Sequence, residues 1–79
     1  MCINGGNMQE KVFIVIGENR IVAVYKTQIQ AIMRTYRENQ LLLQKDHYLK
    51  KEELNNIWNS VQQQCNSDYP FYWQSFNLE

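Results

Sequence analysis

Two runs of β-branched residues on either side of a short polar turn are the feature that most constrains the fold of this chain. The runs are KVFIVI (11–16) and RIVAVYK (20–26), and both have the length and composition of β-strands. The turn between them contains Glu18 and Asn19, and an Asn tolerates a positive φ there. The pattern therefore predicts a β-hairpin over 11–26 with Glu18-Asn19 as a two-residue loop.

Both faces of this hairpin are apolar. The loop predicts that Ile16 faces Ile21, Ile14 faces Ala23 and Val12 faces Tyr25, while the opposite face carries Phe13, Val15, Val22 and Val24. A solvated antiparallel hairpin normally has one polar face. We therefore expect another part of the protein, or a partner, to cover each side.

The hairpin is followed by a segment with a helical pattern. Thr27-Gln28-Ile29-Gln30 fits a capping box, in which the Thr hydroxyl accepts the amide of Gln30 and the Gln side chain reaches back. A helix over about 28–44 is predicted. Its apolar stripe is expected to contain Ile29, Ile32, Met33, Tyr36 and Leu43.

A second amphipathic segment predicts a helix over 51–65. Its apolar positions follow helical spacing, and Glu52 and Glu53 in the first turn complement the helix dipole. After Pro70, the residues FYWQSFNL predict a strand over 71–78. The apolar stripe of this helix is expected to contain Leu54, Ile57, Trp58, Val61 and Cys65.

Together these elements predict an α+β fold with a three-stranded, mostly antiparallel sheet and two helices. At least one helix is expected to pack on the sheet face that carries the small Ala23. The last strand is free to flank either strand of the hairpin, since the two-helix connection is long. We expect a flexible leader over 1–8, which is Gly- and Asn-containing, and a single domain over 9–79.

The aromatic residues of the last strand are the main candidates for function. Alternation places Phe71 and Trp73 on one face, and Tyr72, Gln74 and Phe76 on the other. One set closes the core; the other is either covered by the second helix or exposed as a partner or dimer surface. The candidate partner-binding residues are Phe13, Val15, Val22, Val24, Phe71, Tyr72, Trp73 and Phe76.

The chain shows no set of residues typical of catalysis. His47 is the only histidine, and with two distant cysteines it does not match a zinc spacing. Glu52 and Glu53 are consecutive in a predicted helix, so they point about 100° apart and do not form a catalytic carboxylate pair. We therefore expect a non-enzymatic protein with no catalytic residues, no metal site and no cofactor.

A basic patch offers an alternative function. Arg34 and Arg37 lie one turn apart on the first predicted helix, and lysines lie near its end and after it. An ordinary solvated helix face explains the same pattern, with Arg34 and Glu38 paired at i, i+4. The residues of a nucleic-acid-binding or regulatory protein would be Arg34, Arg37, Lys45, Lys50 and Lys51.

Charge and hydropathy limit the partners and the compartment. The 79 residues carry eight basic and eight acidic side chains, so bulk attraction to nucleic acid or to an anionic membrane is not expected to drive binding. No run approaches the roughly 20 apolar residues that span a bilayer. The first residues lack the pattern of a secretory signal, so we expect a cytoplasmic protein whose partner is a protein, including a second copy of this chain.

The order of the elements resembles that of small bacterial and phage proteins of uncharacterised families. In these, a hairpin ending in residues such as IVAVY is followed by a Thr- or Ser-capped helix and a closing aromatic strand. KVFIVIGENRIVAVYKTQIQAI and FYWQSFNL match that order over roughly half the chain. The resemblance and the small size imply a phage or mobile-element accessory protein that occupies a surface on a larger partner, such as an inhibitor of host defence of the anti-CRISPR kind.

Overall fold

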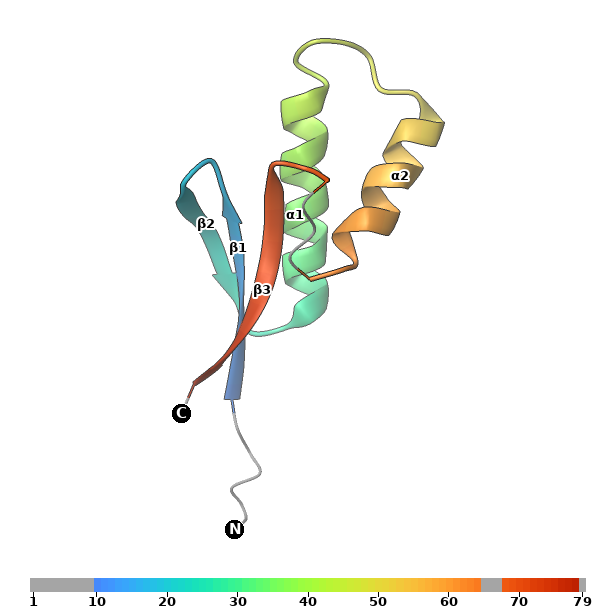
Figure 1. The fold of residues 1–79 in the computed structure, drawn as a ribbon. Coiled ribbons are helices and arrows are strands. Elements are labelled where there is room, and N and C mark those ends of the chain that lie inside the picture. Colours follow the sequence, from blue (N-terminus) through green and yellow to red (C-terminus); the bar gives the residue numbers. More distant parts are fainter. Residues whose placement is uncertain (1–9, 65–67, 79) are drawn as a thin grey trace.

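The structure is a computed structural model, and it describes residues 10–64 and 68–78. Five elements follow one another along the chain (Figure 1). They are β1 (Glu10–Gly17), β2 (Arg20–Tyr25), α1 (Gln28–Leu43), α2 (Lys51–Val61) and β3 (Phe71–Leu78). The leader predicted over 1–8 lies outside the described residues.

The strands form one antiparallel sheet in the order β2-β1-β3. This confirms the predicted α+β fold and places the last strand beside β1. Helix α1 contacts all three strands, and α2 packs against α1. Both helices lie on the same side of the sheet, as Figure 1 shows. The opposite face of the sheet is therefore not covered by any described element.

The hairpin forms with the predicted two-residue loop but not with the predicted register. Glu18 and Asn19 have φ values of 53° and 63°, as a type I′ turn requires. Ile16 faces Ile21 as expected, and the register then shifts by one residue at a β-bulge. The extra residue is Val22. The expected pairs beyond it are wrong: Tyr25 faces Phe13, Val24 faces Ile14 and Ala23 faces Val15.

The bulge decides which side chains of the hairpin face the helices. Val15 is fully buried, and Phe13, Val22, Ala23 and Tyr25 pack against the same core. The expectation that Phe13, Val15, Val22 and Val24 share a face is therefore wrong. Val24 alone of these four lies on the opposite side of the sheet. As predicted, α1 packs on the face that carries Ala23.

The side chains that α1 buries against the sheet are smaller than those of its predicted apolar stripe. Ala31, Thr35 and Asn39 are fully buried, which lets the helix axis come close to the strands. The Thr35 hydroxyl donates to the carbonyl oxygen of Ala31 at 2.7 Å, so its burial leaves no unpaired group. Ile29 and Met33, expected in the core, are exposed.

The helix ends and the buried residues of α2 agree more closely with the predictions from sequence. The Thr27 hydroxyl accepts the amide of Gln30 as predicted, although the Gln30 side chain binds that hydroxyl and not the Thr27 amide. In α2, Ile57 and Val61 are buried. The helix ends at Val61, short of the predicted residue 65, and Cys65 lies outside the described residues.

Strand β3 is attached to both helices by side chains. The amide of Asn39 donates to the carbonyl oxygen of Phe71 at 3.0 Å and accepts the Phe71 N–H at 2.9 Å. The indole N–H of Trp73 donates to the carbonyl oxygen of Val61. On β1, Gly17 lies opposite Phe71, and a Cβ there would come within 2.1 Å of the Phe71 ring. Glycine is thus required for this close approach.

No helix in residues 10–64 or 68–78 has the length and apolar character needed to cross a membrane.

Replacement of Asn39 tests the attachment of β3. Asn39→Ala leaves the buried N–H and C=O of Phe71 without partners, so the free energy of unfolding is expected to fall by about 2–4 kcal/mol. Urea unfolding followed by circular dichroism measures this change. The control Asn55→Ala, at an exposed position on α2, is expected to change stability by less than about 0.5 kcal/mol. Equal effects of the two substitutions would contradict this assignment.

Candidate functional site

The uncovered face of the sheet is the candidate functional site, and we refer to it as the open face. Strand alternation and the observed register place its side chains opposite those that contact the helices. Nearly all are apolar. The open face comprises Val12, Ile14 and Ile16 from β1, Ile21 and Val24 from β2, and Tyr72, Gln74, Phe76 and Leu78 from β3.

The open face exposes large apolar side chains to solvent. Ile21 is 62% exposed and Val24 is 54% exposed, both on β2. On β3, Phe76 is 43% exposed and Leu78 is 50% exposed. Scattered apolar residues are common on protein surfaces, but a contiguous patch over three strands is typical of a binding surface.

Among the described residues, the charged side chains that border the open face lie at one end of it. Glu10, Lys11 and Lys26 line a surface hollow there with Val12 and Leu78. This hollow therefore carries one negative and two positive groups. Gln74 is the one polar side chain among the open-face residues named above. Because the others are apolar, the removal of water from this surface on binding has a low desolvation cost.

Three of the eight predicted partner-binding residues lie on the open face. These are Val24, Tyr72 and Phe76. Val15, Phe71 and Trp73 are instead buried under the helices, and Phe13 and Val22 are half-buried against the same core. The structure thus divides the predicted set between the two sides of the sheet.

In the register predicted from the sequence, the other apolar residues of the open face lie on the helix side. Val12, Ile14, Ile16 and Ile21 were expected to face the helix together with Ala23, and Leu78 was not selected. One signal for the correct assignment was available: Gln74 marks its face of the last strand as the one nearer to water. No residue of the hairpin indicated the bulge, which decides the face of the sheet on which the β2 side chains lie.

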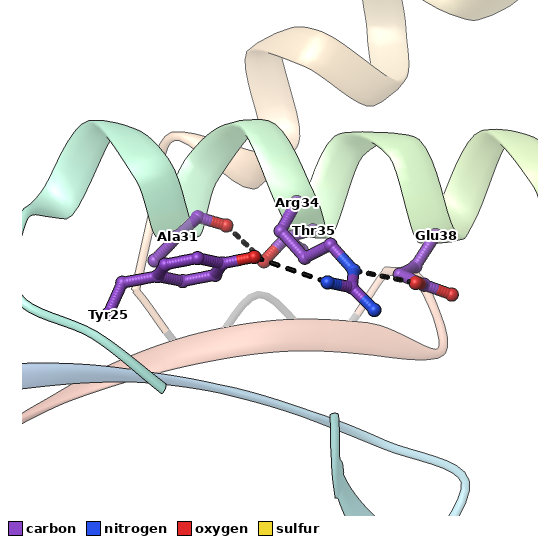
Figure 2. Close-up of polar contacts among 5 residues, drawn as sticks. All are labelled: Tyr25, Ala31, Arg34, Thr35 and Glu38. Carbon is purple, nitrogen blue, oxygen red and sulfur yellow. Dashed lines mark hydrogen bonds and ion pairs between the residues drawn. The ribbon is translucent and has the colours of Figure 1, made fainter. Parts of the chain in front are cut away.

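The basic residues of the alternative function do not form one free surface. Figure 2 shows the Arg34 guanidinium between Tyr25 and Glu38. Its Nε lies 2.7 Å from a carboxylate oxygen of Glu38, the predicted i, i+4 pair, and its Nη1 donates to the Tyr25 hydroxyl at 3.2 Å. The hydrogen bonds to Glu38 and Tyr25 raise the pKa of Arg34. The charge of Arg34 is therefore paired with that of Glu38 within the fold.

The remaining basic candidates are exposed and lie at three places. Arg37 lines the same hollow of α1 as Arg34. Lys45 shares a hollow near the hairpin loop with Arg20, Glu18 and Glu38. Lys50 and Lys51 lie at the start of α2. Carboxylates beside Arg34 and Lys45 weaken the positive potential that a nucleic-acid backbone requires.

His47 and Glu53 contact each other at the start of α2. Glu53 accepts the backbone N–H of Lys50 at 2.9 Å and lies 3.2 Å from Nε2 of His47. Both contacts hold the start of α2, which agrees with the predicted helix-start role of this residue. Among the described residues, no group of three or more His, Cys, Asp or Glu side chains is placed to hold a metal ion.

Comparisons with known proteins give no match, so the candidate site rests on the geometry described above. No family model, no curated protein and no solved structure matches this chain.

The contacts of Glu53 predict how stability depends on pH. The hydrogen bond from the Lys50 backbone, and then the contact with His47, lower the pKa of Glu53. Its stabilisation is therefore present above the carboxyl pKa of the unfolded chain, about 4.3, and is lost as the pH falls through the lower pKa of the folded chain. We expect Glu53→Gln to be less stable than the wild type at pH 7 and nearly equal to it at pH 3.

Urea unfolding midpoints at the two pH values measure this difference. Glu52→Gln is the matched control, because Glu52 lies in the same first turn and is exposed. A Glu53→Gln variant whose deficit is as large at pH 3 as at pH 7 would show that the charge of Glu53 is not what stabilises this turn.

Proposed function

We propose that this chain is a non-enzymatic protein-binding module that acts through the open face. The observation that carries the proposal is the contiguous apolar surface over all three strands, at which Ile21, Val24, Phe76 and Leu78 are exposed. Burial of such a surface against a partner removes apolar area from water and stabilises the complex. The helices form one layer, the sheet forms the second, and a partner would supply the third.

The same surface suits a protein that acts by occupying part of a larger partner. A rigid sheet presents its side chains without ordering a loop, so binding does not incur that loss of entropy. Exposed aromatic and β-branched side chains supply most of the buried area. Together with the small size and the resemblance to phage proteins, this supports an accessory role such as inhibition of a host defence system.

Affinity capture tests the proposal with one altered position on each side of the molecule. Val24→Asp introduces a charge on β2, opposite Ile14 of the central strand, where it would be desolvated on binding. Ile29→Asp introduces the same charge at a residue of α1 that is also 54% exposed. Each variant is immobilised, exposed to extract of the source cell and washed, and the captured proteins are identified by mass spectrometry.

We expect the wild type and Ile29→Asp to retain the same partner and Val24→Asp to lose it. Circular dichroism melts establish that each variant is folded. Retention of the partner by folded Val24→Asp would refute the proposal. Binding of DNA or RNA that weakens steeply with salt and is lost in Arg37→Ala would instead favour the nucleic-acid function.

A further inference from the structure

We infer that a hollow on the helix side of this protein, the α1 hollow, binds an acidic peptide segment of another protein. The hollow lies along α1, and one residue of β2 and one of α2 complete its lining. The side chains that carry the argument are Tyr25, Met33, Arg34, Tyr36, Arg37 and Trp58. The open face lies on the opposite side of the sheet. The inference therefore goes beyond the proposed function and does not depend on it.

The lining has the composition of a protein-binding hot spot. Tryptophan, tyrosine, arginine and methionine are enriched at protein interfaces, whereas lysine, aspartate and glutamate are depleted. Three aromatic residues and two arginines line the α1 hollow, and none of the described residues that line it is a lysine or an acid. Met33 is 58% exposed, so it is available for contact. Tyr36 and Trp58 pack edge to face, with ring centroids 5.4 Å apart, which orders this part of the lining before a partner binds.

The charges of the lining select a partner with a carboxylate. Both charged side chains of the hollow, Arg34 and Arg37, are positive. Glu38 pairs with Arg34 from outside the lining, so one net positive charge remains among these three side chains. Arg37 is exposed, and its guanidinium makes no hydrogen bond or ion pair with the other described residues. A guanidinium binds a carboxylate through two parallel hydrogen bonds, so Arg37 fits an Asp or Glu side chain.

The shape and the other side chains favour a peptide as the source of this carboxylate. The hollow has a volume of about 620 Å³ but is open along α1, so a segment of chain fits it better than a small ligand that needs enclosure. Gln40 also lines it, and a Gln amide both donates to and accepts from a peptide backbone. Tyr25, Tyr36 and Trp58 are half-buried, which leaves little ring surface for stacked bases. One net charge is also too few for a nucleic-acid strand.

Selection from a phage-displayed library of random dodecapeptides on the immobilised wild type tests the inference. The selected peptides are expected to contain Asp or Glu beside an aromatic or aliphatic residue. The acid binds Arg37, and the apolar neighbour covers Met33. Arg37→Glu reverses the charge of the site, so the same library is expected to yield peptides with Lys or Arg in place of the acid.

Fluorescence polarisation of one selected acidic peptide measures the contribution of each position. Arg37→Glu and Met33→Glu are each expected to raise the dissociation constant about tenfold or more, because each places a carboxylate against that of the peptide. Lys45→Glu is the control for Arg37→Glu, because Lys45 is an exposed cation at another hollow. Ile29→Glu is the control for Met33→Glu, at a position of α1 that is 54% exposed and outside the lining. Both controls are expected to bind as the wild type does.

Circular dichroism melts establish that the variants are folded, which is expected because all four positions are exposed. A library that yields no binding peptide, or peptides without an acidic residue, would overturn the inference. Binding that is unchanged in both Arg37→Glu and Met33→Glu would overturn it as well. Fluorescein-labelled single-stranded DNA that binds more tightly than the selected peptide and is released by Arg37→Glu would assign the hollow to nucleic acid instead.

Val24→Asp separates the α1 hollow from the open face. This variant is expected to bind the selected peptide with unchanged affinity, even where it has lost the partner captured through the open face. In nuclear magnetic resonance spectra, the peptide is expected to shift the indole N–H of Trp58 and not the methyl groups of Val24. Loss of peptide binding in folded Val24→Asp would place the acidic peptide on the open face and refute the α1 hollow as its site.

Discussion

The pair of hydrogen bonds between Asn39 and Phe71 is the contact on which the arrangement of this protein depends. They join residues 32 positions apart, from the middle of the chain to the first residue of the last strand. The Asn39 side chain is fully buried and its amide uses both a donor and an acceptor. Such a buried pair is costly to break, since each freed backbone group stays away from water. It therefore fixes β3 to α1 at one defined register.

That fixed register determines the rest of the sheet. With Phe71 held by α1, its ring lies over Gly17 and β3 continues along β1. Trp73 then lies under the helices and donates its indole N–H to α2, while Tyr72, Gln74 and Phe76 turn to the other side. The same contacts that close the core thus leave one face of the sheet open. That face is exposed because β3 is attached with Trp73 toward the helices. Both helices pack on the other side of the sheet.

Local sequence patterns predicted the elements well, because their signals act over a few residues. The two-residue loop at Glu18-Asn19, the Thr27 cap and the start of α2 at residue 51 were all predicted. The α+β class followed from the order of these elements. The core face of α1 was predicted less well, because apolar spacing favoured Ile29 and Met33, whereas the sheet selects small residues that allow close approach.

The open face could not be assigned from sequence, because it depends on one inserted residue. Side chains alternate with a period of two, so a single bulge at Val22 exchanges the two faces for the rest of the hairpin. The place of β3 beside β1 could not be assigned either, because it depends on the contact between Asn39 and Phe71, which are far apart in the sequence. Because both faces of β1 are apolar, neither register is penalised by the hairpin alone. The helices decide between them, and the face that they leave uncovered is the one available for a partner.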